Sequence, residues 1–352
     1  MLNIGQLASA VQGNCHISDA RHAGEFGLCV FLLKMREYYR WENDIPLTEQ
    51  LRREEVGAWM QERERMWDRL DAADYAPLPL ASSQADPFHV EIINRELVPE
   101  GYVYSGGIGR FCKPHFFLGQ LERQERRCGF TIYTSSCEYA RDIEAPPAML
   151  QGQTIFVRKE SVRRFAWEKI EEARFNQNNP AMQKVIAAYG FDADLEAALE
   201  RMTENETETM TLHELGEGLA GQRLGERWEA MLLALSRSKA EIMARAVRDL
   251  VADCSTTLPA LLQREAHASL HFYFANFTGM RRQLFPELAQ AYRQWLAGGA
   301  IRALARTAAD GEARWLDVAG QMLRLYARDG EQVGEAIVGL LEPPAARRAT
   351  AH

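Results

Sequence analysis

The chain lacks the segments that would direct it to or through a membrane. No run reaches the roughly 18 to 20 apolar residues needed to span a bilayer, and the apolar stretch at residues 28–33 is broken at once by Lys34 and Arg36. Residues 1–15 contain no basic segment followed by a long apolar run, so we expect no secretory signal. These absences predict a cytoplasmic protein with no membrane partner.

Cysteine pairs are also absent. The six cysteines form no C-x-x-C motif and are scattered over 352 residues, at Cys15, Cys29, Cys112, Cys128, Cys137 and Cys254. Disulfide scaffolds are short and dense in cysteine, so the spacing excludes one. We expect reduced thiols, in keeping with a cytoplasmic location.

Positive charge is in deficit. Lys and Arg number 41 against 49 Asp and Glu, a formal net charge of −8. This balance gives no general attraction to nucleic acid, and no nucleic-acid module, P-loop or G-x-S-x-G elbow is present. We therefore expect no nucleic-acid partner and keep a small-molecule substrate open. Nothing in the pattern indicates an oligomeric state.

What the chain does contain is typical of a folded protein of about two domains, with 47% hydrophobic and 26% charged residues. Helical periodicity predicts helices over 19–43 and 47–71 and again from Ser161 onward. Between them a helix is expected at 114–127. Short β-branched and aromatic runs predict strands at 88–93, 101–104, 130–134 and 154–157.

These elements predict a mainly α protein, a helical bundle with a small α+β insertion at about residues 85–160. The expected domains are N-terminal helices that pack on the C-terminal bundle, the insertion, the helical bundle and a frayed tail, at residues 1–80, 81–160, 161–342 and 343–352.

Histidine is scarce, and five of the eight histidines fall in three clusters. In the first, His213 and Glu217 are one helical turn apart on one face, with Glu214 beside them. The segment resembles the opening of the zincin signature H-E-x-x-H, but Glu replaces the last histidine, so no peptidase activity follows. Gly216, Gly218 and Gly221 cost helix propensity, which suits close approach of a helix or ligand.

The second cluster pairs His267 with His271 at the same one-turn spacing, followed by aromatic residues including Tyr273. The third lies at an expected helix start and consists of His16, Asp19, His22 and Glu25. Imidazole and carboxylate groups on facing helices are the usual ligands of a metal in a helical bundle. The proposed ligands are His213, Glu217, His267, His271, His22 and Glu25, with Glu214 as catalytic base or further ligand.

Such mixed nitrogen and oxygen ligands suit iron first and zinc second. We interpret the chain as a metal-binding helical protein, either a non-haem iron oxidoreductase or a zinc hydrolase; the ligands alone do not fix whether it is an enzyme. The alternative is a non-enzymatic helical interaction protein with structural histidines. A third hypothesis is an anion site made of Arg36, Arg40 and Arg110.

Overall fold

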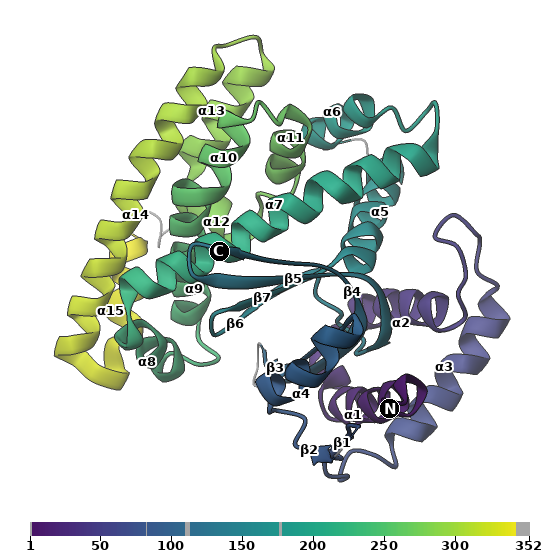
Figure 1. Ribbon diagram of the computed structural model, residues 1–352. Helices are drawn as coiled ribbons and strands as arrows, with labels where there is room; N and C mark the ends of the chain where they lie inside the picture. Colours follow the sequence, from purple (N-terminus) through teal and green to yellow (C-terminus); the bar gives the residue numbers. More distant parts are fainter. Residues whose placement is uncertain (1, 82, 110–112, 176–177, 343–352) are drawn as a thin grey trace. The chain divides into compact units, whose positions relative to one another are not determined.

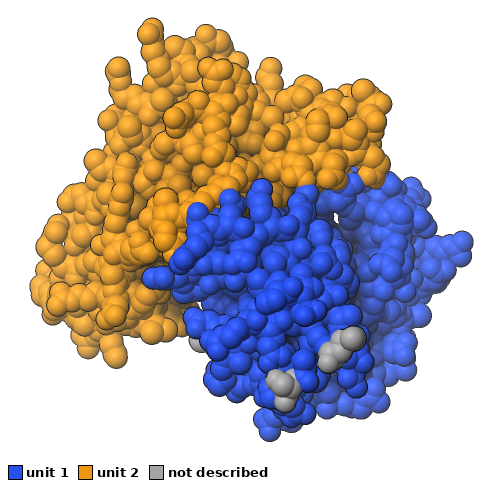
Figure 2. All heavy atoms as spheres, viewed as in Figure 1, with its two compact units in different colours: residues 1–126, 131–167 blue, residues 127–130, 168–352 orange. Residues whose placement is uncertain are grey.

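A computed structural model describes residues 2–81, 83–109, 113–175 and 178–342 (Figure 1). Helix makes up 66% of it, beside one five-stranded curled sheet, which confirms a mainly α protein with a β part. None of the described helices is both long and apolar enough to cross a membrane. The chain divides into two compact units (Figure 2): unit 1 is residues 1–126 and 131–167, and unit 2 is residues 127–130 and 168–352. The expected frayed tail, 343–352, lies outside the described residues.

Unit 1 opens with helices. They are α1 (Ile4–His22), the 3₁₀ turn η1 (Ala23–Glu25), α2 (Leu28–Glu42), α3 (Arg53–Trp67), α4 (Val90–Leu97), the 3₁₀ turn η2 (Val98–Glu100) and the first part of α5 (Lys159–Phe175). The Asn3 side chain caps α1 by accepting from the backbone N–H of Gln6 at 3.1 Å. The predicted single helix over 19–43 is wrong, because the chain leaves α1 at Ala23 and α2 begins only after Gly27. Glycine disfavours helix, and Gly24 and Gly27 flank this break.

The sheet has the strand order β3-β4-β5-β7-β6. Its strands are β3 (Tyr102–Ile108), β4 (Pro114–Arg127), β5 (Phe130–Arg141), β6 (Ala148–Gln151) and β7 (Thr154–Arg158), and a separate pair is β1 (Leu78–Pro79) with β2 (Gln84–Ala85). β3 pairs with β4 and β6 with β7 antiparallel, whereas β5 and β7 run parallel.

Two local predictions in this region are wrong. Residues 114–127, expected to be helical, form β4, because residues 114–120 pair with β3 and the strand also lies beside β5 in the sheet. This pairing outweighs the helix propensity of the Glu and Arg residues in the segment. Residues 88–93, expected to be a strand, lead into α4. The carboxylate of Asp86 accepts from the backbone N–H of Phe88 at 2.8 Å and starts this turn, while Ile93 and Leu97 are buried one helical turn apart.

The described part of unit 2 consists of helices and their connections, apart from residues 127–130 between β4 and β5. Its helices are α6 (Pro180–Tyr189), α7 (Leu195–Leu224), α8 (Glu226–Ala234), α9 (Lys239–Ala252), the π-helical turn η4 (Asp253–Thr257), α10 (Leu258–Gln263), α11 (His267–Ala275), α12 (Gly279–Leu284), α13 (Pro286–Leu296), α14 (Ile301–Asp329), the 3₁₀ turn η5 (Gly330–Val333) and α15 (Gly334–Leu341). The long helix α7 packs along α9 and η4, and α14 packs on α9 as well. Met243, Val247 and Leu250 of α9 are fully buried between them.

Two glycines allow α7 to approach its neighbours closely, as the sequence predicted. A Cβ atom on Gly216 would lie 2.8 Å from the carbonyl oxygen of Ala252, and one on Gly218 would lie 2.5 Å from the ring of Phe130. Gly221 differs, because a Cβ atom there would meet nothing within 4 Å. Gly216 therefore fixes the α7 backbone directly against the end of α9.

Candidate functional site

The seam between α7 and the α9–η4 segment brings four ionisable side chains together. His213 and Glu217 lie one turn apart on α7, and Asp249 and Asp253 have the same spacing across the seam. Because Gly216 lets the two backbones approach, short side chains reach across. Asp253 begins a π-helical turn, a distortion that is often found at functional sites. We call this group the His213 cluster.

Within the His213 cluster, Asp253 accepts hydrogen bonds from three side chains. Its fully buried carboxylate accepts hydrogen bonds from Nδ1 of His213 at 2.9 Å, from the Tyr273 hydroxyl at 2.8 Å and from the Arg281 guanidinium at 2.8 Å. Burial alone would raise the pKa of Asp253, but Arg281 and His213 outweigh it and hold this pKa below its ordinary value. The carboxylate is therefore ionised and rigidly held.

His213 lies between two carboxylates. While Nδ1 faces Asp253, Nε2 lies 3.3 Å from Oε1 of Glu217, and 27% of the side chain is exposed. Burial would lower the pKa of His213, but the hydrogen bonds to Asp253 and Glu217 raise it well above its ordinary value. This shift favours the imidazolium form, which can donate from both nitrogens.

Glu217 links this pair to a second set of charges. Its Oε2 accepts from Arg248 at 2.5 Å. Burial opposes ionisation, yet His213 and Arg248 lower the pKa of Glu217 to about 2. The neighbouring Asp249 shows the opposite shift, because burial and the charge of Glu217 raise its pKa to about 6. The cluster thus holds two acids with well-separated pKa values, a pattern common at functional sites.

Glu214 lies on α7 next to His213. It is half-buried, and its charge acts with those of Glu217 and Asp249 to raise the pKa of Arg248 against the effect of burial. The predicted base is therefore on the Arg248 side of the cluster.

The second predicted pair, His267 and His271, contacts other residues. Nδ1 of His271 lies 2.9 Å from the Tyr292 hydroxyl, and its ring stacks on Trp295 with centroids 4.9 Å apart. His267 meets the same indole edge-on at 5.4 Å. Burial and the nearby His267 lower the pKa of His271 to about 4. The His271 ring is therefore neutral at neutral pH, and both histidines lie in an aromatic cluster with α13.

The third predicted cluster lies in unit 1, at the end of α1 and not at a helix start. His22 and Glu25 stay together, with Nδ1 and Oε1 3.5 Å apart. Asp19 instead binds Lys113 at 2.9 Å, and His16 faces Arg63 at 2.9 Å. Among the residues that the structure describes, no group of three or more His, Cys, Asp and Glu side chains is arranged to hold a metal ion.

The arginines of the predicted anion site already have acidic partners. Arg36 lies 3.0 Å and Arg40 3.3 Å from opposite oxygens of Glu37, and Arg40 also donates to the carbonyl of Glu49. Arg110 lies outside the described residues. The two described arginines thus form the intrahelical pairing that competes with anion binding.

Comparison with known families covers almost the whole chain. Models of the N-terminal and C-terminal domains of a family of unknown function, DUF6866, match residues 6–158 and 163–344. The chain belongs to this family. No curated protein and no solved structure matches it significantly. The His213 cluster lies within the C-terminal DUF6866 domain.

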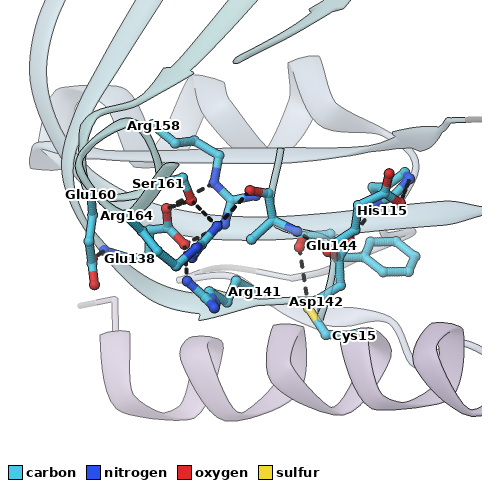
Figure 3. A network of polar contacts seen from close by, with 12 residues as sticks. Cys15, His115, Glu138, Arg141, Asp142, Glu144, Arg158, Glu160, Ser161 and Arg164 are labelled. Atoms are coloured by element: carbon cyan, nitrogen blue, oxygen red, sulfur yellow. Dashed lines mark hydrogen bonds and ion pairs between the residues drawn. The ribbon is translucent and has the colours of Figure 1, made fainter. Parts of the chain in front are cut away.

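Unit 1 holds its own buried polar network (Figure 3). Glu138 accepts from Arg158 and Ser161 at one end, and His115 lies 2.6 Å from Asp142 at the other. Burial and the Glu138 charge raise the pKa of Glu160 to about 7. Glu138 also borders a cleft of about 560 Å³. The ion pair of Glu138 with Arg158 connects β5 with β7, and the hydrogen bond that Glu138 accepts from Ser161 connects β5 with α5.

Sequence reasoning found the α7 half of the His213 cluster and missed the half across the seam. Asp249 and Asp253 repeat the one-turn spacing of His213 and Glu217, and that repeat was the available signal. Arg281 gave no local signal, since its role depends on the fold of α12.

Proposed function

We propose that the protein binds a divalent metal ion at the His213 cluster. His213 Nε2 and Glu217 Oε1 are the first two ligands, and Asp249 is the third. The observation that carries the proposal is the hydrogen bond from Nδ1 of His213 to Asp253, which leaves Nε2 facing Glu217. Metal-binding histidines almost always make such a bond to a carboxylate or carbonyl with their other nitrogen.

The separation of the two ligand atoms supports this proposal. Nitrogen and oxygen ligands about 2.0 to 2.2 Å from one ion, at the angles of tetrahedral or octahedral geometry, lie roughly 3 to 3.5 Å apart. Nε2 and Oε1 are 3.3 Å apart. Arg248 binds the other oxygen of Glu217 and leaves Oε1 facing the imidazole. Asp249 shares a hydrogen bond with Glu217 and would turn from it to the ion.

Charge supports the same position. The carboxylates of Glu217 and Asp253 that stabilise the His213 proton would also attract a divalent cation. Binding then exchanges the Nε2 proton for the ion, so each bound ion releases a proton and affinity rises with pH. One imidazole with carboxylates suits iron or zinc. Bound iron would supply redox or oxygen chemistry, and bound zinc an activated water with Glu214 as base.

Calorimetric titration of the untagged protein with Zn²⁺, or with Fe²⁺ under anaerobic conditions, tests the proposal. We expect one ion per chain, a heat that varies with the ionisation enthalpy of the buffer, and at least a tenfold loss of affinity in His213→Ala and Glu217→Gln. His89→Ala changes an exposed histidine of unit 1 and serves as the control. Equal binding by His213→Ala would overturn the site.

The variant His267→Ala separates this site from the wider ligand set that includes His267 and His271. We expect His267→Ala to leave the affinity for the metal ion unchanged, because the rings of His267 and His271 contact Trp295, which lies outside the His213 cluster. If no variant binds differently and purified protein holds no ion, the contacts of His213 support the alternative class, a non-enzymatic interaction protein with structural histidines.

A further inference from the structure

Several apolar side chains are exposed at the start of α2 in unit 1. Leu28 is 71% exposed, Leu33 59%, Val30 48% and Leu32 44%. Single exposed apolar residues are ordinary, but four within six residues on two turns of one helix are not. Such a surface is typical of a site that another apolar surface covers.

A groove of about 420 Å³ adjoins this surface. Its apolar wall comes from three elements: Phe26 after η1, Leu28 and Phe31 of α2, and Trp67 at the end of α3. Trp67 is nearly fully buried and anchors the wall to unit 1. We call this depression the α2 groove; Leu28 is the exposed leucine that lines it.

One rim of the α2 groove is acidic. Glu64, Asp68 and Asp71 line it, are exposed, and have no side-chain ion pair within the described chain. Two nearby cations donate to backbone carbonyls. Arg21 donates to the backbone carbonyl of Asp71 at 2.8 Å, and Lys34 donates to that of Glu144 at 3.4 Å. The rim therefore presents three carboxylates beside an apolar wall.

We propose that the α2 groove binds a basic amphipathic helix of a partner protein. Apolar side chains on one face of that helix, at i, i+3, i+4 and i+7, would pack between Phe31 and Trp67 and over Leu28. Lysine or arginine side chains beside them would meet Glu64, Asp68 and Asp71. An anionic membrane or a nucleic acid does not fit, because the same three carboxylates repel both. The proposal is independent of metal binding in unit 2.

The probe is a fluorescent 18-residue helix of leucine and lysine, with leucine at the four spacings above, and its counterpart has glutamate for every lysine. Anisotropy titration with the full chain is expected to give saturable binding of the lysine peptide only. Glu64→Lys combined with Asp68→Lys is expected to weaken it roughly tenfold or more. Glu62→Lys, an exposed position on the same helix outside the groove, is the matched control and should change affinity less than twofold.

Leu28→Ser tests the apolar half, and its high exposure leaves folding unchanged. We expect at least a fivefold loss of affinity for the lysine peptide. Equal binding of the glutamate peptide, or a loss with Glu62→Lys as large as with the double variant, overturns the proposal. Sedimentation that shows a dimer which Leu28→Ser dissociates assigns the groove to a second copy instead. Binding to phosphatidylserine vesicles assigns it to lipid; both results overturn the partner-helix proposal.

Discussion

The imidazole of His213 donates to the carboxylate of Asp253 at 2.9 Å across the seam between α7 and η4. Asp253 is fully buried and also holds Tyr273 and Arg281, so one carboxylate fixes side chains from three helices. Removing that one charge affects all three partners at once, which makes the bond a sensitive point for both stability and ionisation.

Asp253→Asn should therefore destabilise the protein by about 3 to 5 kcal/mol, because Arg281 and His213 lose their buried counter-charge. Urea unfolding measures this loss. NMR titration should show the pKa of His213 falling toward its ordinary value in the variant. Asp317→Asn, at an exposed position of α14, should change stability by less than about 0.5 kcal/mol. A His213 pKa that does not move would show that Glu217 alone sets it.

Gly216→Ala and Gly221→Ala should change stability in opposite directions. A Cβ atom on Gly216 meets the backbone of Ala252, so the helices must separate, and we expect a loss of about 1 to 3 kcal/mol. Gly221 faces open space on the same helix, and alanine there should stabilise by up to about 1 kcal/mol. Thermal unfolding of both variants measures the difference. Two variants with equal melting temperatures would mean that α7 does not touch α9 as described.

The raised pKa of Glu206 should make the free energy of unfolding fall as pH rises. Burial raises its pKa to about 7 against the hydrogen bonds from Ser269 and its neighbours. The folded state then keeps a proton on Glu206 that the unfolded state releases above about pH 4.5. The stability that this proton uptake gives the folded state is therefore lost between about pH 4.5 and 7. As pH rises from 5 to 8, the free energy of unfolding of Glu206→Gln should increase by roughly 3 kcal/mol relative to that of the wild type. Denaturant midpoints across that range test it, with the exposed Glu200→Gln as control.

Lys113→Met should destabilise unit 1. Lys113 and Asp19 are both buried and lie 2.9 Å apart, so removing the cation leaves a buried carboxylate unpaired, at a cost of about 3 to 5 kcal/mol. The double variant Lys113→Met/Asp19→Asn should recover part of that loss. Lys169→Met, in a more exposed pair with Glu172, should change stability by less than about 1 kcal/mol. Additive losses in the double variant would contradict a direct interaction.

The sequence predicted what depends on short-range spacing. The helix that carries His213 and Glu217, the one-turn geometry of that pair and the close approach at Gly216 all follow from residues a few positions apart. The ligand set beyond this pair remains a prediction.

Features that depend on residues far apart in the chain were not predicted from the sequence. Segment 114–127 is a strand because it lies between β3 and β5 in the sheet, although its Glu and Arg content favours helix. Asp253 looked like any acid near a helix end, and only the packing of η4 against α7 places it beside His213. Contacts between residues far apart in the sequence decided both cases.

The π-helical turn η4 also sets the rotational phase of the helix that contains it. An α-helix advances about 100° per residue, whereas a π turn fits one extra residue into a turn. Residues after Thr257 are therefore rotated relative to an uninterrupted helix from Lys239 to Gln263. Asp253 can face α7 while Leu258 and Leu261 remain buried. A one-residue deletion within η4 would shift that phase, so that either Asp253 would turn away from α7 or Leu258 and Leu261 would become exposed.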